Sequence, residues 1–311
     1  MSLQHYLADH YQDKSTLQSL IAKGIAIKSN PQAYSNALAG KSVAMLFEKP
    51  SLRTHISFDI GINKMGGHAL YIGQQNGQLG ERERIKDVAQ NLACWADAII
   101  ARVFKQSVLD EMAEHANIPV INALSDLYHP CQALADYMAL TETFGTVAGL
   151  KVCYIGDANN VSNSLMLMGA VLGAHVTVVT PQGHGPSQVM IDTAEQLATE
   201  NGGKVLVSTD VNAASDQQVI YTDTWISMGD STKVEEILET FMPYQVNEQL
   251  MQISGAQAVM HCQPAHLEQE VTTQVFDSNK SIAMLQAENR MWAQNALLLS
   301  LLTPLANNQQ S

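Results

Sequence analysis

The sequence predicts an α/β protein with two domains, each a parallel sheet flanked by helices. Three observations favour this class. The chain has 311 residues, above the size at which a single core usually stops growing. Hydrophobic residues make up 46% and charged residues 15%, a composition typical of a folded globular protein. Short apolar runs alternate with helical patterns along both halves, as in sheets whose parallel strands are joined by helices.

The first half contains four short apolar runs that predict strands. They cover residues 42–47, 68–72, 97–101 and 118–122. Between the first two, residues 52–64 have a helical pattern that ends at Gly66-Gly67, a typical helix stop. A further helix is predicted to begin at Pro130 and to end at Gly145.

The second half repeats this alternation and predicts a second domain. Its strands are expected at residues 151–155, 175–179, 204–208, 218–222 and 258–261. A last helical run, residues 289–302, is apolar on nearly every face and should therefore be buried. We place the first domain at residues 1–147 and the second at 148–290, with 291–311 as a C-terminal helix that packs back on the first domain.

Composition also limits the possible partners. A formal net charge of -13 argues against a surface for nucleic acid or an anionic membrane. No run reaches roughly 18 uninterrupted apolar residues, and the first residues do not resemble a signal peptide, so we expect a cytoplasmic protein. The four cysteines lie at wide spacings without a C-x-x-C pair, so neither disulfides nor a metal site is expected.

The first candidate site is the segment Lys49-Pro50-Ser51-Leu52-Arg53-Thr54, between a predicted strand and a predicted helix. Free N–H groups and the positive end of the helix dipole lie at such a helix start. Two hydroxyls and a guanidinium add further donors, so the segment is suited to cradle a phosphate. An ordinary serine N-cap followed by a surface arginine would have the same sequence.

The second candidate site begins the helix that starts at Pro130. His129 and Gln132 are three residues apart at its N-terminus and can face one ligand. A neutral histidine can donate to a carbonyl oxygen, and a glutamine amide can bond a carbamoyl NH2 group; a helix cap with a buried histidine is the alternative. Arg102 ends a predicted strand at the sheet edge where ligands bind, although a lone arginine there is often only solvated.

Polar segments in the second half form the third candidate site. They cover residues 157–160, 223–229, 261–264 and 288–290. Three of the four follow directly on a predicted strand, where a parallel sheet gathers its site residues. Residues 155–160 also suggest a dinucleotide-binding turn, but they lack the G-x-G-x-x-G pattern, which disfavours that interpretation.

In this order, the segments resemble the motifs of the aspartate/ornithine carbamoyltransferase superfamily over essentially the whole chain. FEKPSLRTHISFDIG is similar to its S-T-R-T-R loop and LYHPCQALAD to its H-P-x-Q motif. DTWISMG resembles the D-x-x-x-S-M-G loop of the ornithine enzymes, and MHCQPA resembles H-C-L-P. Aspartate enzymes carry H-P-L-P-R and no S-M-G loop, so the resemblance favours ornithine.

The resemblance implies the fold of this superfamily and transfer of the carbamoyl group of carbamoyl phosphate to the side-chain amine of L-ornithine, giving L-citrulline and phosphate. The first domain would bind carbamoyl phosphate and the second ornithine. No metal or redox cofactor is required. The resemblance also implies a role in arginine metabolism and a homotrimer, in which Gln78 reaches the site of the neighbouring subunit.

Site residues follow from the same resemblance, position by position. Those implied for carbamoyl phosphate are Ser51, Leu52 through its backbone, Arg53, Thr54, Gln78, Arg102, His129, Gln132, Cys262, Gln263 and Arg290. Those implied for ornithine are Asn160, Asp223, Ser227 and Met228. Those expected to be catalytic are Arg53, Arg102, His129, Asp223, Cys262 and Arg290.

The chain departs from the family motifs at three positions. Leu52 replaces a threonine, His55 replaces the second arginine of the loop, and Gln263 replaces the leucine of H-C-L-P. These differences bear on affinity rather than on the reaction class. Two alternatives stay open at this point: a carbamoyltransferase for another amine, such as putrescine, aspartate or an N-acylated ornithine, and a binding or regulatory protein that has kept the fold without activity.

Nucleophile activation is the demanding step of the implied reaction. An alkyl amine with a pKa of about 10.4 is almost entirely protonated at pH 7, and making it neutral costs roughly 4.6 kcal/mol. We hypothesise that a desolvated site containing Cys262 and Asp223 favours the neutral amine, and that the departing phosphate takes the remaining proton. Residues 228–233, MGDSTK, are the segment expected to move on substrate binding.

Overall fold

The computed structural model describes residues 4–73, 79–81, 83–225 and 234–303. The described chain forms two compact units. The first comprises Met1–Met138 with Asn289–Ser311, and the second comprises Ala139–Glu288. These divisions lie inside two helices that continue from one unit into the other, α5 (Pro130–Phe144) and α11 (Ala283–Leu302). Among the described residues, no helix combines the length and apolarity needed to cross a membrane.

The first unit is built on a four-stranded parallel sheet with the order β2-β1-β3-β4. Its strands are β1 (Ser42–Phe47), β2 (His68–Ile72), β3 (Ala98–Arg102) and β4 (Val120–Leu124). Its helices, besides parts of α5 and α11, are α1 (Lys14–Ser29), α2 (Leu52–Lys64), α3 (Ile85–Ala93) and α4 (Gln106–His115), with short 3-10 turns at Asp9–Tyr11 and Pro31–Tyr34.

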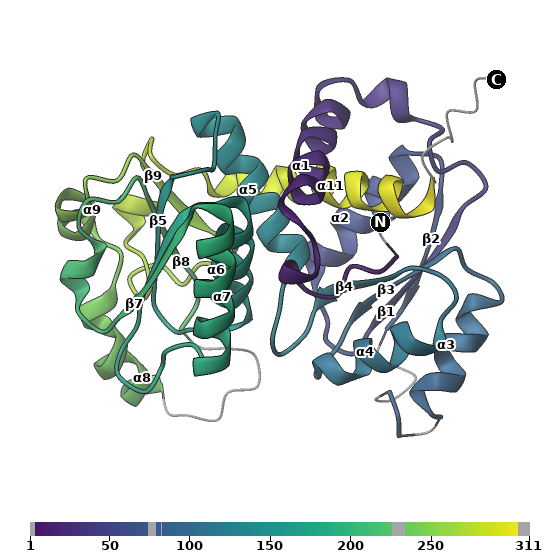
Figure 1. Ribbon diagram of the computed structural model, residues 1–311, viewed down its shortest axis with the longest axis horizontal. Helices are drawn as coiled ribbons and strands as arrows, with labels where there is room; N and C mark the ends of the chain where they lie inside the picture. The colour runs from purple at the N-terminus through teal and green to yellow at the C-terminus, as the bar shows by residue number, and fades with distance from the viewer. Residues whose placement is uncertain (1–3, 74–78, 82, 226–233, 304–311) are drawn as a thin grey trace. The chain divides into compact units, whose positions relative to one another are not determined.

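Alternating strand residues form separate cores on the two faces of this sheet. Ile99 and Ala101 of β3 pack with α3 and α4, which lie together on one side of the sheet, while α2 lies on the other (Figure 1). Gly61 of α2 permits a close approach of α11, because a Cβ at this position would lie 2.3 Å from Oδ1 of Asn295.

The second unit is built on a five-stranded parallel sheet with the order β7-β6-β5-β8-β9. Its strands are β5 (Lys151–Ile155), β6 (His175–Val179), β7 (Lys204–Ser208), β8 (Val219–Thr222) and β9 (Ala258–His261). Its helices are α6 (Asn160–Leu172), α7 (Gln188–Asn201), α8 (Val234–Phe241), α9 (Glu248–Ser254) and α10 (Thr273–Phe276), with 3-10 turns at Val211–Ala214 and Met242–Tyr244. Helices α6 and α7 lie side by side on one face of the sheet (Figure 1).

The predicted class, two parallel sheets flanked by helices, is confirmed. Each of the nine predicted strands is present, with small shifts at its ends. β4 begins at Val120 rather than at residue 118, because Pro119 has no N–H to donate to a neighbouring strand. The last helix begins at Ala283 and not at the predicted residue 289, so the more polar segment before the apolar run is also part of the helix.

The strand orders explain where polar side chains gather. In the first sheet the chain passes from β1 to β2 on one side and then to β3 on the other, so the order reverses between β1 and β3. In the second sheet it reverses in the same way between β5 and β8. Ligands of open α/β sheets bind at the carboxyl ends of the strands at such switch points. The segments that follow these four strands are therefore the expected ligand-binding positions.

Candidate functional site

In the first unit, the switch point joins the segment after β1 to Arg102 at the end of β3. Phe47 and Arg102 are partners in the strand register, and the backbone N–H of Glu48 donates to the carbonyl of Arg102 at 2.8 Å. Ser51 then caps α2, because its hydroxyl accepts from the backbone N–H of Thr54 at 3.3 Å. The predicted phosphate segment therefore does begin a helix, next to a buried arginine.

Arg290 connects the two candidate sites of this unit. Its Nη2 donates to Oγ1 of Thr54 at 2.8 Å, and its Nη1 donates to Oε1 of Gln132. The amide nitrogen of Gln132 donates in turn to Asp136 at 2.7 Å. Three segments far apart in the sequence thus meet in one buried polar network. Asp136 was not singled out from the sequence, although its i,i+4 spacing from Gln132 on the helix was a visible signal.

His129 lies at the start of α5, where its carbonyl accepts from the backbone N–H groups of Gln132 and Ala133. Burial, together with the positive charges of Arg290 and Arg102, lowers the pKa of the His129 imidazole well below its usual value. The ring is therefore neutral at pH 7. A neutral imidazole can donate a hydrogen bond from one nitrogen while the other accepts, as the sequence analysis expects for a group facing a carbonyl oxygen.

The remaining residues of the first segment differ in exposure. The side chain of Leu52 is 71% exposed, so its backbone rather than its side chain is available to an anion. Arg53 is half-buried at the start of α2. His55, the departure from the family motif, stacks on Tyr71 with the ring centroids 4.0 Å apart. The imidazole thus takes part in an aromatic contact with β2.

Lys49 begins the predicted phosphate segment, but the sequence analysis assigned it no role. Burial, and next the charge of Arg102, lowers the pKa of its ammonium group, against the opposite effects of Asp126 and Glu48. Its Nζ lies 4.7 Å from the centroid of the Phe104 ring. A lysine two residues after the interior strand β1 was the signal that could have identified it, because the loop after that strand lies at the switch point.

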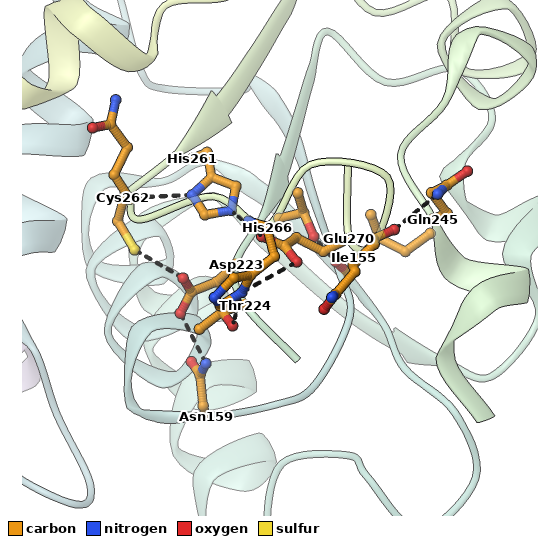
Figure 2. Close-up of polar contacts among 12 residues, drawn as sticks. Ile155, Asn159, Asp223, Thr224, Gln245, His261, Cys262, His266 and Glu270 are labelled. Carbon is orange, nitrogen blue, oxygen red and sulfur yellow. Dashed lines mark hydrogen bonds and ion pairs between the residues drawn. The ribbon is translucent and has the colours of Figure 1, made fainter. Parts of the chain in front are cut away.

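In the second unit, Asp223 follows β8 at the switch point and is buried. Its Oδ1 accepts from Sγ of Cys262 at 3.1 Å, and its Oδ2 accepts from Nδ2 of Asn159 at 3.0 Å (Figure 2). Cys262 follows the neighbouring strand β9. The structure thus brings together the two side chains that the sequence analysis assigned to amine activation.

Asn159 has two tasks that the sequence analysis did not recognise. Its Oδ1 accepts from the backbone N–H groups of Val161 and Ser162 at 2.8 and 3.2 Å, so it caps α6. Its amide nitrogen remains available to hold Asp223. Asparagine is well suited to this position, because its side-chain amide accepts through the oxygen and donates through the separate nitrogen. Asn160, which was proposed to bind ornithine, is the first residue of α6 and is half-buried.

Asp223, His261 and Cys262 also place one potential metal-ligand atom each within 4.8 Å of one another. Both ring nitrogens of His261 make hydrogen bonds, Nδ1 with the backbone N–H of Gln263 and Nε2 with Glu270. A metal ion would have to displace one of these bonds. The geometry is therefore that of a hydrogen-bonded network. Gln78, Ser227, Met228 and the segment 228–233 lie outside the described residues.

Two parallel α/β units, each with buried polar side chains at its own switch point, define a two-domain α/β protein with a candidate ligand site in each unit. Residues 4–142 match the family model described as the carbamoyl-P binding domain of aspartate/ornithine carbamoyltransferase, and residues 148–301 match its Asp/Orn binding domain. The chain therefore belongs to the aspartate/ornithine carbamoyltransferase family.

Individual relatives show the same similarity. The chain is 53% identical over 299 residues to the ornithine carbamoyltransferase of Shewanella oneidensis, covering 96% of this chain and 99% of the relative. It is 51% identical over 289 residues to that of a Vibrio species, covering 93% and 96%. The solved ornithine carbamoyltransferase of Pyrococcus furiosus superposes with a TM-score of 0.94 at 42% identity and covers 98% of this chain and 99% of its own.

Proposed function

We propose that the chain transfers the carbamoyl group of carbamoyl phosphate to the side-chain amine of L-ornithine, giving L-citrulline and phosphate in arginine metabolism. The observation that carries this proposal is the network of Arg290, Thr54 and Gln132. Thr54 and Gln132 belong to two separate motifs of the family, and Arg290 of α11 joins them in one buried network. Relatives with the same two domains are named for ornithine.

Carbamoyl phosphate is the ligand of the first unit. Its phosphate carries about two negative charges, which suit the N-terminus of α2 and the guanidinium groups of Arg53 and Arg102. The acidic average charge of the chain makes such a local concentration of positive charge necessary. The residues proposed to hold carbamoyl phosphate are Ser51, Leu52 through its backbone, Arg53, Thr54, Arg102, His129, Gln132 and Arg290, with the main-chain carbonyls of Cys262 and Gln263 and with Gln78 of a neighbouring subunit.

Negative charge develops on the carbamoyl oxygen as the amine attacks. Arg53, Thr54 and neutral His129 supply donors for that oxygen, and loss of one such donor costs about 2.7 to 4 kcal/mol in other enzymes. The hydroxyl of Thr54 accepts from Arg290, so its own proton is directed away from the guanidinium. Arg290 thereby orients a donor for the substrate while it contributes positive charge.

Ornithine is the proposed ligand of the second unit, through Asn160, Asp223, Ser227 and Met228. Asp223 pairs with the α-ammonium group of ornithine. It also lies beside the thiol of Cys262, the second residue assigned to activation of the side-chain amine. In this mechanism the side-chain ammonium group gives one proton to solvent before attack, and the departing phosphate accepts the second proton. Cys262 and Asp223 belong to adjacent strand ends, so one ligand can contact both.

A homotrimer is the proposed assembly, and the cytoplasm is the proposed location. Support comes from an exposed apolar patch on the first unit, formed by Leu52, Ile56 and Ile60 of α2 and by Leu70 and Tyr71 of β2. The three α2 residues are spaced i, i+4 and i+8 along one helix face, and β2 is an edge strand. Several large exposed apolar side chains on neighbouring elements are typical of a protein–protein interface.

The direct test is formation of citrulline by the purified full-length protein from carbamoyl phosphate and ornithine, compared with aspartate, putrescine and N-acetylornithine as acceptors. Ornithine should give the highest kcat/KM. A higher value for another amine would correct the acceptor while leaving the carbamoyl donor in place. No turnover with any amine, in protein that is folded and binds carbamoyl phosphate, would support the alternative of a binding protein.

A further inference from the structure

Glu270 is a fully buried carboxylate of the second unit that the motifs do not include. It is 0% exposed, and His261 beside it is 2% exposed. One of its oxygens, Oε1, accepts from the backbone N–H of His266 at 2.6 Å and lies 3.1 Å from Nε2 of His261 (Figure 2). A buried carboxylate is costly unless it is hydrogen-bonded, so this arrangement requires a reason.

The hydrogen bonds of His261 determine which of its nitrogens carries the proton. The backbone N–H of Gln263 points at Nδ1 of His261 at 2.9 Å. An amide N–H can only donate, so Nδ1 must be unprotonated, and the proton resides on Nε2. From there it is donated to Glu270. The ring is thus held as a single neutral tautomer by one acceptor and one donor on opposite sides.

The accepting nitrogen of this ring stabilises an unfavourable turn. Gln263 has a φ of 63°, a left-handed conformation that non-glycine residues adopt only at a cost. The turn includes Cys262, whose Sγ donates to Asp223 at 3.1 Å. A ring with its proton on Nδ1 would place N–H against N–H and would push the turn away.

We propose that Glu270 is a positioning residue: it holds the proton of His261 on Nε2, so that Nδ1 can accept from Gln263 and fix the Cys262–Gln263 turn. Its effect on catalysis rests on the proposed function, in which this turn serves the carbamoyl group. The arrangement is not a proton relay from the thiol, because Cys262 donates to Asp223.

The test compares Glu270→Gln with Glu270→Ala. Glutamine can keep an acceptor oxygen at the position of Oε1, whereas alanine removes it. Glu270→Ala should lower kcat for citrulline by at least about tenfold through misplacement of the turn, and Glu270→Gln should stay within about threefold of wild type. Glu195→Ala is the matched control, because Glu195 is an exposed carboxylate on helix α7 of the same unit. It should retain wild-type kcat.

A second readout is independent of turnover. In protein labelled with 15N-histidine, the His261 signal, assigned by its loss in His261→Asn, should report an unprotonated Nδ1 in wild type and Glu270→Gln. It should shift toward a mixture of tautomers in Glu270→Ala. An unchanged tautomer in Glu270→Ala, or an equal loss of kcat in Glu270→Gln and Glu270→Ala, would overturn the proposal. If wild type makes no citrulline, the proposed function fails, and the tautomer measurement still decides the role of Glu270.

A pair of variants at His261 keeps the test decisive even if Glu270→Ala does not fold. Asparagine places its side-chain oxygen near the position of Nδ1, so His261→Asn can still accept from Gln263. Glutamine places its amide near the position of Nε2 and loses that bond. His261→Asn should therefore retain at least about fivefold more activity than His261→Gln. The reverse order would show that an acceptor for Gln263 is not what the ring supplies.

Discussion

Asp223 accepts hydrogen bonds from two different loops, which hold its carboxylate in one position. In the proposed function that charge serves ornithine alone, so Asp223→Asn should weaken ornithine binding between about tenfold and a hundredfold, as expected for loss of a charge-assisted bond. Carbamoyl phosphate affinity should change little. Separate KM values for the two substrates measure this. Asp192→Asn, on the exposed part of α7, is the control. Equal losses for both substrates would show that Asp223 is structural.

The lowered pKa of His129 predicts how the free energy of unfolding depends on pH. Its folded-state pKa lies well below its usual value, whereas in the unfolded chain it is near 6.5. Above that pH neither state binds the proton. As the pH falls below about 6.5, only the unfolded state is protonated, so the free energy of unfolding falls by up to about 1.4 kcal/mol per pH unit.

Urea unfolding between pH 5 and 8 tests this linkage, with His129→Gln as the comparison. The variant should show a shallower decline on acidification, whatever its stability at pH 8. Some decline should remain, because burial also lowers the pKa of His5, His10 and His175. Parallel curves for the variant and wild type would contradict the assignment of His129 as a neutral buried ring.

At the scale of elements, the contact of α2 with α11 depends on the absence of a side chain at Gly61. Gly61→Ala would place a methyl group against Met291 and the buried Asn295, and overpacking of this kind typically costs about 1–3 kcal/mol. Gly185→Ala, at an exposed position with room for a methyl group, should change stability by less than about 0.5 kcal/mol. Thermal or urea unfolding of both variants measures the difference. Equal stabilities would mean that Asn295 moves aside freely.

The elements also show what sequence patterns can predict. Apolar runs predicted all nine strands. The interior strands are buried and continuously apolar, and the edge strands β2 and β7 keep apolar residues although they are largely exposed. The switch points then followed from the order of pairing. A shared site for Asp223 and Cys262 was predicted, whereas the hydrogen bond between their side chains was not. The roles of Asn159 and Glu270 were not predicted, because each depends on a hydrogen bond between loops that only the folded chain brings together.

For the whole molecule, the proposed trimer predicts active sites that are formed by residues of two subunits. If Gln78 of one subunit serves the site that holds Arg53 of another, Arg53→Ala and Gln78→Ala proteins should each be impaired. Random hybrids formed at equal amounts should regain about a quarter of the native sites, since each site draws its two residues from different chains. The proteins are mixed, unfolded and refolded together, and their activity is compared with that of the parents refolded separately.

Mass measurement of the mixture provides the control for subunit exchange. Mixed trimers with activity no higher than the average of the parents, although Gln78→Ala alone is clearly defective, would mean that each site is complete within one chain. Substitution of Ile56 and Ile60 by serine addresses the assembly itself. If the apolar patch on α2 and β2 is the interface, this double variant should sediment as a monomer.

Two reversals of strand order, one in each sheet, also bear on how such an enzyme can diversify. The donor is proposed to depend mainly on the strand ends of one sheet, and the acceptor on those of the other. Changes near Asp223 can then select a new amine without rebuilding the phosphate cradle. Substrate range is therefore expected to be modular, so that a graft confined to the loops after β5 and β8 would exchange the acceptor while the donor stays the same.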